Sequence, residues 1–300
     1  MERQLFTIYG ATGQQGGALI RYLLKHPRFS KIYKLRGITR DSSKPRAQAL
    51  AQQGVVMVEA DMNDPDSLKR ATQGSHIVFA MTDFWLSGSR EIETQQGKAQ
   101  ADAAVQAGAQ AIIWSSLPRI GLPNFDSKAD VEEYIRSLSI KAAFYRPGWF
   151  MQNHLTFSKP VEEEERGGGG QGDRGRCEAH TLVPLVDNED IGKYLQPFLD
   201  DVEEKYDGVG LTACSAFVTP VHMCEVWSRV TGKVVKFEKE GGDGGGVTGG
   251  GGARGGDGDS WYYGEGSRKA MEWTLAQMEE KTTSWEEFVE RVEGEEAWFR

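Results

Sequence analysis

A glycine-rich turn, YGATGQQGG, occupies residues 9–17. Gly10, Gly13 and Gly16 lie three residues apart, after the apolar run LFTIY and before the amphipathic run ALIRYLL. At the end of a buried strand, the first such glycine permits a tight turn, the second lets a pyrophosphate approach the backbone, and the third lets the next helix pack closely on the sheet. The N–H groups at the start of that helix then face the phosphates. The spacing predicts a dinucleotide site formed by Gly10, Ala11, Thr12, Gly13, Gln14, Gln15 and Gly16.

The end of the second predicted strand bears on the choice between NAD and NADP. The chain reads GITRDSSK at 37–44. An acidic residue at this point would bind the ribose 2′-hydroxyl of NAD, whereas a guanidinium can grip a 2′-phosphate and stack on the adenine. Arg40 has the chemistry for the phosphate, and Lys44 would add positive charge. The sequence therefore favours NADP, and Asp41 keeps NAD open as the less favoured cofactor.

The ends of the third and fourth predicted strands supply further candidate contacts. Asp61 and Met62 follow the third strand, where the adenine of a dinucleotide usually lies, although Asp61 could equally cap a short turn. Met81 and Thr82 end the fourth strand, beside the expected path of the nucleotide. Phe84 begins an aromatic pair that either walls the pocket or is buried in the core. We expect Asp61, Met62, Met81, Thr82 and Phe84 to contribute to nucleotide binding.

A parallel sheet would bring these residues together at the edge formed by the carboxyl ends of its strands. The first 150 residues have the sequence pattern of such a sheet. Short β-rich runs alternate with helical stretches, which is typical of βαβ units. Runs such as IVFA at 77–80 and IIW at 112–114 are apolar without alternation, as strands buried on both faces are. The predicted strands are 5–9, 33–39, 55–59, 76–81, 111–115 and 142–145, and the predicted helices are about 16–26, 44–53, 66–72, 91–107 and 127–138.

The second half of the chain reads as a smaller α+β region. Strands are predicted at 182–186, 209–213 and 234–237, with helices that open after the acidic run at 187–190, at Thr219, and over 264–280 and 283–293. We therefore expect an α/β fold, a Rossmann-type doubly wound parallel sheet with a smaller α+β C-terminal domain. The domains are predicted at 1–155 and 156–300, and segments of the second could return to the first.

Two stretches, 162–176 and 241–258, are dominated by glycine. Such a composition cannot bury a core. They read as mobile lids, as linkers, or as positions where Gly and Glu stand for side chains that were not identified. The third interpretation is favoured, because a compact domain rarely holds a long structureless insert. No function is assigned to either stretch.

Composition excludes some classes of function. The formal net charge of −9 argues against a broad nucleic-acid surface, so any link to DNA would run through a protein partner. The three cysteines lie far apart, and no His or Cys spacing indicates a metal. The first residues lack the layout of a signal peptide, and no apolar run approaches the length of a membrane span. We expect a metal-free protein of the cytoplasm, and also of the nucleus if it regulates transcription.

Several motifs together resemble those of the NmrA-like proteins, an atypical branch of the short-chain dehydrogenase superfamily. They are YGATGQQGG, GITR, EADMNDPDSL, QGK at 96–98, WSSL at 114–117, FDSKADVEEY at 125–134 and YRPGWFMQN at 145–153. The resemblance implies an NADP-preferring Rossmann domain with a small second domain. It also implies one of two functions: a redox sensor that binds NADP or NAD and changes partners, often transcription factors, or an isoflavone-reductase-like enzyme that reduces small molecules with NADPH.

Lys128 separates these two functions. Conventional short-chain dehydrogenases place a Tyr four residues before a Lys on one helical face, and the phenol passes a proton. Here Asn124 stands four residues before Lys128, and Tyr134 is out of register with it. Lys128 could clamp the nicotinamide ribose, or it could itself be the acid or base, as in the isoflavone-reductase-like branch. The resemblance also places Pro147, Phe150 and Asn153 against the nicotinamide half of the cofactor.

The sequence thus predicts an NADP(H)-binding redox sensor that acts through a partner protein. The alternative is an NADPH-dependent reductase of a small carbonyl or enone substrate that uses Lys128. The absent tyrosine favours the sensor, whereas the retained lysine and the aromatic residues favour the reductase. A scaffold without nucleotide is the least favoured reading, because the glycines and Arg40 remain.

Overall fold

The structure is a computed structural model, and it describes residues 2–156, 173–175, 179–201, 205–239 and 262–293. The chain divides into two compact units. The first consists of Met1–Arg146 and Ile191–Leu211, and the second of Pro147–Asp190 and Thr212–Arg300. Within the described ranges, no helix is both long and apolar enough to cross a lipid bilayer.

The first unit is built on a seven-stranded sheet with the strand order β10-β6-β5-β4-β1-β2-β3. The pairs β1–β2, β2–β3, β1–β4, β4–β5 and β5–β6 are all parallel. The strands are β1 (Gln4–Ile8), β2 (Tyr33–Thr39), β3 (Val56–Glu59), β4 (Ile77–Ala80), β5 (Ala111–Ser115), β6 (Lys141–Pro147) and β10 (Val209–Ala213). The predicted Rossmann-type doubly wound parallel sheet is confirmed.

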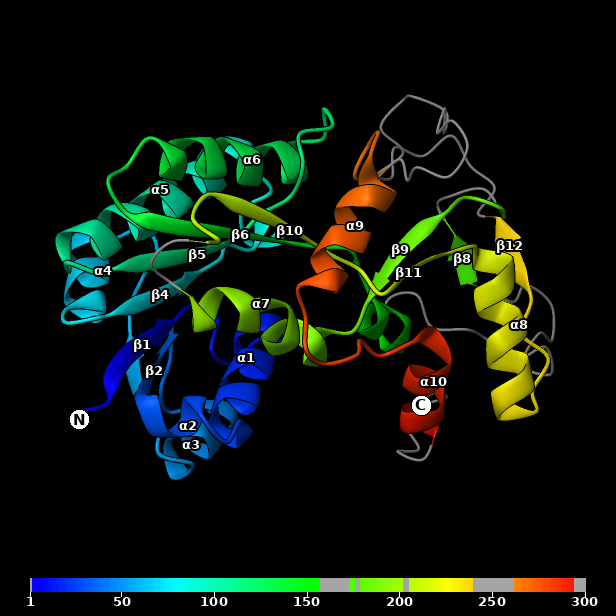
Figure 1. The fold of residues 1–300 in the computed structure, drawn as a ribbon, viewed down its shortest axis with the longest axis horizontal. Helices are drawn as coiled ribbons and strands as arrows, with labels where there is room; N and C mark the ends of the chain where they lie inside the picture. Colours follow the sequence, from blue (N-terminus) through cyan, green and yellow to red (C-terminus); the bar gives the residue numbers. More distant parts are fainter. Residues whose placement is uncertain (1, 157–172, 176–178, 202–204, 240–261, 294–300) are drawn as a thin grey trace. The chain divides into compact units, whose positions relative to one another are not determined.

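Helices cover both faces of this sheet (Figure 1). One face carries α4 (Pro65–Thr72), α5 (Arg90–Gln106) and α6 (Pro123–Arg136). The other carries α1 (Gln14–Lys25), α3 (Pro45–Gln52) and α7 (Ile191–Asp200), with the short α2 (Phe29–Ile32) beside α1. Because helices cover both faces, β4 and β5 are buried along their whole length, which explains their apolar runs without alternation.

The strand order places a topological switch point between β1 and β4. From β1 the chain moves outward through β2 to β3, and it then returns to β4 on the other side of β1 and continues to β5 and β6. Ligands of doubly wound sheets bind outside the carboxyl ends of the strands at such a point. The turn after β1 is therefore the part of the fold best placed to meet a ligand.

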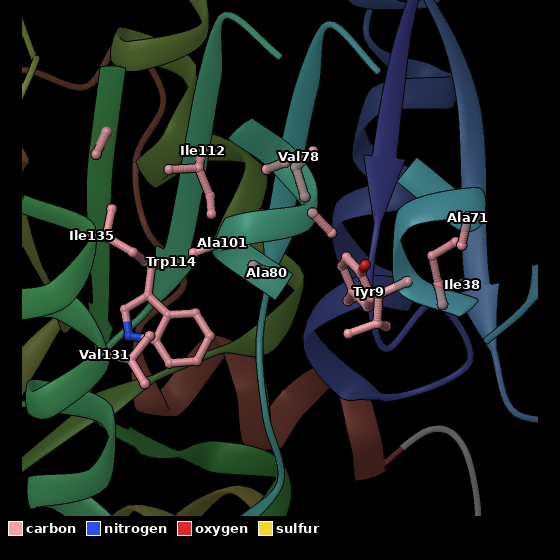
Figure 2. Close-up of a cluster of buried hydrophobic side chains, with 14 of the residues drawn as sticks. Tyr9, Ile38, Ala71, Val78, Ala80, Ala101, Ile112, Trp114, Val131 and Ile135 are labelled. Carbon is pink, nitrogen blue, oxygen red and sulfur yellow. The ribbon is translucent and has the colours of Figure 1, made fainter. Parts of the chain in front are cut away.

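The core between the sheet and helices α4, α5 and α6 is organised around Trp114 (Figure 2). Its ring packs against Val131 of α6, and α5 comes close to the same place at Gly97. A Cβ at Gly97 would lie 2.6 Å from Val131 Cγ2 and 2.9 Å from Trp114 Cη2. The indole Nε1 of Trp114 donates to the carbonyl oxygen of Lys128 at 3.0 Å. The packing of α5 and α6 thus fixes the backbone that carries Lys128.

In the described part of the second unit there are two small sheets and three α-helices. The order β11-β9-β7 joins Ala216–Val218, Val183–Val186 and Trp149–Phe150, and β12 (Phe237–Lys239) pairs with β8 (Asp173–Gly175). The helices are α8 (Pro220–Thr231), α9 (Ser267–Ala276) and α10 (Trp285–Glu293). Asp187 accepts from Arg291 Nη2 of α10 at 2.6 Å, and both oxygens of Asp190 accept from Thr283. These buried carboxylates hold the segment of α10 to that of β9.

Two expectations for the second half need comment. The predicted strand at 234–237 is wrong, because β12 begins only at Phe237. Val235 is buried, its N–H donates to Ser228 Oγ at 2.9 Å and its carbonyl accepts from the same hydroxyl at 3.2 Å, so this stretch is tied to α8 instead of a sheet. Residues 241–258 lie outside the described residues, and so do residues 162–176 apart from β8.

Candidate functional site

The glycine turn after β1 has a geometry that requires glycine at two of its three positions. Gly10 has a φ of +63°, and a Cβ there would lie 2.8 Å from Met81 Sδ. A Cβ at Gly16 would lie only 2.4 Å from the carbonyl oxygen of Gly10. The N–H of Gly13 donates to that same carbonyl at 2.9 Å, which closes the turn. Any larger residue at Gly10 or Gly16 would force the turn open.

The same turn leaves the start of α1 prepared for an anion. Gly13 is the N-cap, no side-chain hydrogen bond caps the helix, and its first turn has no acidic residue. The turn is anchored on both sides, since Tyr9 N–H donates to Phe79 O at 2.9 Å and Ala11 N–H donates to Ile38 O at 3.3 Å. An anchored helix start with a glycine N-cap and no side-chain cap, at a switch point, fits a pyrophosphate.

Gln15 and Ser115 connect the turn to the end of β5. Ser115 Oγ donates to Gln15 Oε1 at 2.7 Å. The next serine, Ser116, donates to the buried Glu132 at 2.6 Å. Both hydroxyls at the end of β5 are therefore engaged by protein acceptors.

The loop after β2 presents Arg40 at the surface. Arg40 is exposed, and the described part of the chain offers it no hydrogen bond or ion pair. By contrast, Asp41 is committed to its own loop, because its carboxylate accepts from the N–H of Ser43 at 2.9 Å and from its hydroxyl at 2.6 Å. These bonds hold the pKa of Asp41 below its ordinary value, with a smaller contribution from the charge of Lys44. The exposed Lys44 is the N-cap residue of α3.

Two residues that the sequence reasoning missed help to shape this loop. Glu59, at the end of β3, accepts from the N–H of Ser42 at 2.8 Å and from its hydroxyl at 2.6 Å, which lowers the pKa of Glu59. Arg46, in the first turn of α3, reaches the carbonyl of Thr12 with Nη1 at 3.5 Å. The only signal for Arg46 was its place in a basic cluster with Arg40 and Lys44.

Asp61 and Met62 have local roles in the structure. Asp61 Oδ1 accepts from the N–H of Asn63 at 2.9 Å and from its side-chain amide at 3.0 Å, so Asp61 closes a turn. The helix α4 that follows is capped by Asp64 instead, through bonds from the N–H groups of residues 66 and 67. Met62 is half-buried and packs against the core. Their contact with adenine stays a prediction.

The end of β4 is held by a glutamine and approaches the glycine turn. Met81 N–H donates to Gln100 Oε1 at 3.2 Å, and Gln100 Nε2 donates back to Met81 O at 3.1 Å. The side chain of Met81 lies against Gly10. Further on, Phe84 and Trp85 form an edge-to-face pair at 5.5 Å in the 3-10 helix Phe84–Leu86, with Phe84 half-buried and Trp85 exposed. The pair is thus not a buried core pair.

Lys128 lies in a compact polar cluster with Thr82 and Glu93. Its ammonium Nζ donates to Thr82 O at 2.9 Å, to Thr82 Oγ1 at 3.1 Å and to Glu93 Oε1 at 2.8 Å. The Glu93 side chain is fully buried, and that of Lys128 is 13% exposed. Sequence reasoning found Lys128 and Thr82 but missed Glu93, because in the run REIETQQGK it reads as an ordinary charge on a helix surface.

The structure supplies no phenol to Lys128 in the position used by conventional short-chain dehydrogenases. Asn124 occupies that position, and the hydroxyl of Tyr134 donates to Asp102 Oδ1 of α5 at 2.6 Å, an interaction that raises the pKa of Tyr134. Among the described residues, no group of three or more His, Cys, Asp or Glu side chains could hold a metal ion.

A second buried carboxylate, Glu132, anchors the strand ends beside this cluster. It accepts from Ser116 Oγ, from Arg136 Nε at 3.1 Å and Nη2 at 2.8 Å, and from Arg146 Nε at 3.1 Å and Nη2. Burial alone would raise the pKa of Glu132, but the bonds and charge of Arg146, with those of Ser116 and Arg136, hold it below its ordinary value. The network joins β5, α6 and β6.

The last three predicted contacts belong to the second unit. Pro147 ends β6, Phe150 lies in β7 and is half-buried, and Asn153 lies in the 3-10 helix Met151–Leu155. The carbonyl of Asn153 accepts from the N–H of Thr156 at 3.1 Å. Their placement against the nicotinamide stays a prediction.

A doubly wound parallel sheet with a glycine turn at its switch point defines the Rossmann-type class of α/β proteins. The model of the NmrA-like family matches residues 2–241, and the chain belongs to this family. One relative is the NmrA-like family domain-containing oxidoreductase himF of Aspergillus japonicus, 32% identical over 263 residues that cover 78% of this chain and 75% of himF.

Two solved structures share the fold. NmrA, a negative transcriptional regulator in complex with NAD, superposes with a TM-score of 0.77 at 21% identity, over 99% of this chain and 97% of NmrA. An NADPH-dependent quinone oxidoreductase from Escherichia coli, complexed with NADPH, gives a TM-score of 0.68 at 19% identity, over 96% and 99% of the two chains. At these identities the likeness establishes the fold.

Proposed function

We propose that this chain binds NADP(H) at the glycine turn and acts as a redox sensor that regulates a partner protein. The pyrophosphate would lie against the N–H groups that begin at Gly13, because Gly10 and Gly16 keep that approach clear of side chains. NmrA and the E. coli quinone oxidoreductase, which share the fold, are complexed with NAD and NADPH. Gly13, Met81 and Thr82 would line this path.

The preference for NADP rests on the loop after β2. Arg40 is exposed and carries no partner in the described ranges, so its guanidinium is available for a 2′-phosphate. Asp41 and Glu59 each use one carboxylate oxygen to bind a serine of the loop, Asp41 for Ser43 and Glu59 for Ser42, so both carboxylates are oriented by the loop. Arg46 would support the phosphate side through its contact with the turn at Thr12.

The role as a sensor rests on one observation, the engagement of Lys128. Its three protons have three acceptors, on Thr82 and Glu93, and among the described residues no phenol is bonded to it to relay a proton. A lysine held in this way positions the loop after β4, and it has no proton relay of the usual kind. Differential binding of the oxidised and reduced nucleotide would then shift the population of conformations that a partner recognises.

A reductase is the second candidate, favoured by the relation to oxidoreductases such as himF. Bound NADPH would supply a hydride, and the chain would have to deliver the balancing proton to the substrate. Lys128 is the candidate donor, after exchange of one of its acceptors. Phe84 and Trp85 would offer an aromatic surface to a carbonyl or enone.

NADPH oxidation separates the two candidates. The sensor predicts saturable binding of NADP and NADPH, no useful NADPH consumption with a panel of carbonyls, enones and quinones, and hydrogen-exchange patterns that differ between the two bound forms. Turnover that is lost in Lys128→Ala, with nucleotide affinity largely retained, would establish the reductase instead. Identical exchange patterns with both nucleotides would contradict the sensor.

A further inference from the structure

The carboxylate of Glu93 accepts hydrogen bonds from three side chains. Oε1 accepts from Lys128 Nζ at 2.8 Å and from Thr82 Oγ1 at 2.8 Å, and Oε2 accepts a short hydrogen bond from Ser127 Oγ. The Glu93 side chain is fully buried, and the Lys128 side chain is 13% exposed. The cluster joins α5, α6 and the segment after β4 at one point.

The cluster has no net charge only because both ionised groups are present. Removing one partner of a buried pair leaves the other charge uncompensated in a medium that screens poorly. Among the residues that the structure describes, Lys128 is the one positively charged group bonded to Glu93, since Thr82 and Ser127 are neutral donors. Removal of the Glu93 charge therefore leaves the cluster with a net positive charge, and removal of the Lys128 charge leaves it with a net negative charge.

The position of the cluster makes that field relevant to the nucleotide. Thr82 follows Met81, whose side chain touches Gly10 of the glycine turn. A dinucleotide that crosses the sheet edge at the switch point has one half over β2 and β3 and the other over β4 and β5. The inference rests on the proposed binding of NADP(H), and it concerns the half that lies over β4 and β5.

We infer that the Glu93–Lys128 pair sets the relative affinity for oxidised and reduced nucleotide, with Glu93 as a positioning residue that holds and neutralises Lys128. The oxidised nicotinamide ring carries one more positive charge than the reduced ring. A neutral pair leaves this difference nearly unbiased, whereas an uncompensated ammonium disfavours the oxidised form and an uncompensated carboxylate favours it. The intact pair thus keeps the charge of this cluster from favouring either redox state of the nucleotide, and loss of either partner would shift the preference.

The test is the ratio of the dissociation constants for NADP and NADPH, measured by calorimetry in four proteins. Glu93→Gln should raise the ratio Kd(NADP)/Kd(NADPH) by about tenfold, and Lys128→Gln should lower it by about tenfold, on the scale of one unit charge acting in a protein of intermediate screening. The double variant should return to within about twofold of the wild type, because its pair is again neutral. Asp102→Asn, which removes a carboxylate from the same helix outside the cluster, should leave the ratio unchanged.

The outcomes separate a structural role from the proposed one. Melting temperatures should fall for both single variants whether the cluster has a structural role alone or also sets the nucleotide preference. The sign of the change in Kd(NADP)/Kd(NADPH) therefore distinguishes the two roles. Shifts of the same sign in both variants, or no shift beyond twofold, would overturn the inference while the wild type still binds both nucleotides. If Glu93→Gln does not fold, the direction of change in Lys128→Gln alone makes the decision. A wild type that binds neither nucleotide would instead contradict the proposed function.

Discussion

The two halves of the sheet's carboxyl edge differ in where their charged side chains lie and in what those side chains bind. On the side of β2 and β3, the carboxylates of Asp41 and Glu59 lie at the surface and are held by serines, and Arg40 stands exposed beside them. On the side of β4, β5 and β6, Glu93 and Glu132 are buried and each is matched by basic side chains. The first half has an exposed cation, whereas the second has buried carboxylates that are paired with basic side chains.

The largest expected effect on stability comes from removing a buried charge on the side of β4, β5 and β6. Glu132→Gln leaves Arg146 and Arg136 without their shared carboxylate, and we expect a loss of about 3 kcal/mol in the free energy of unfolding. Glu59→Gln, in the exposed half, should leave the free energy of unfolding close to that of the wild type. Urea unfolding of both variants measures the contrast, and equal losses would show that the two halves do not differ.

The glycine turn between the halves should be nearly as sensitive. Gly16→Ala puts a Cβ 2.4 Å from Gly10 O, and we expect about 2–3 kcal/mol of destabilisation together with loss of nucleotide binding. The matched control is Gly17→Ala, whose Cβ would have its nearest contact at 3.3 Å. Urea unfolding and fluorescence titration with NADP report both effects. Normal binding by Gly16→Ala would show that the nucleotide does not use this turn.

Arg40 tests the exposed half directly. Arg40→Ala should weaken NADP binding about tenfold or more, since a charge-assisted bond to phosphate is worth about 1.5–3 kcal/mol. NAD binding should weaken much less, because NAD has no 2′-phosphate and loses at most the stacking of Arg40 on the adenine. Lys44→Ala is the milder comparison and should cost less than Arg40→Ala. Calorimetric titrations with both nucleotides give the result, and an equal loss for NAD would assign Arg40 another role.

The smallest effect is on the pH dependence of stability. An unfolded Glu has a pKa near 4.3, and the pKa of Glu132 in the folded protein lies below that value. The ionised Glu132 therefore contributes its full share to the free energy of unfolding above the unfolded pKa. This contribution is lost as the pH falls through the folded pKa. Wild-type stability should therefore fall more steeply than that of Glu132→Gln between about pH 5 and pH 3. Parallel curves of unfolding free energy against pH, from urea unfolding across this range, would show that the charge of Glu132 does not contribute to stability.

The sequence predicted the fold well because the relevant signals are local. The apolar runs of β4 and β5 and the Thr219 N-cap of α8 depend only on neighbours in the chain, and the structure confirms them. The buried charge pairs depend on tertiary contacts. Glu93 and Lys128 are 35 residues apart, and their alignment follows from the packing of α5 on α6, which no periodicity reveals.

The failed strand at 234–237 has the same origin. Two adjacent valines favour a strand by propensity, but Ser228 of α8 binds both backbone groups of Val235. A single hydroxyl, brought close by a preceding helix, thus replaced the sheet partner that the pattern predicted.

Calorimetric titration of the wild-type protein with NADP and with NAD, under identical conditions, tests the central claim most directly. The account predicts saturable binding of one nucleotide per chain, with NADP tighter than NAD because Arg40 is free to bind the 2′-phosphate. No saturable heat with either nucleotide, or equal affinity for both, would contradict it.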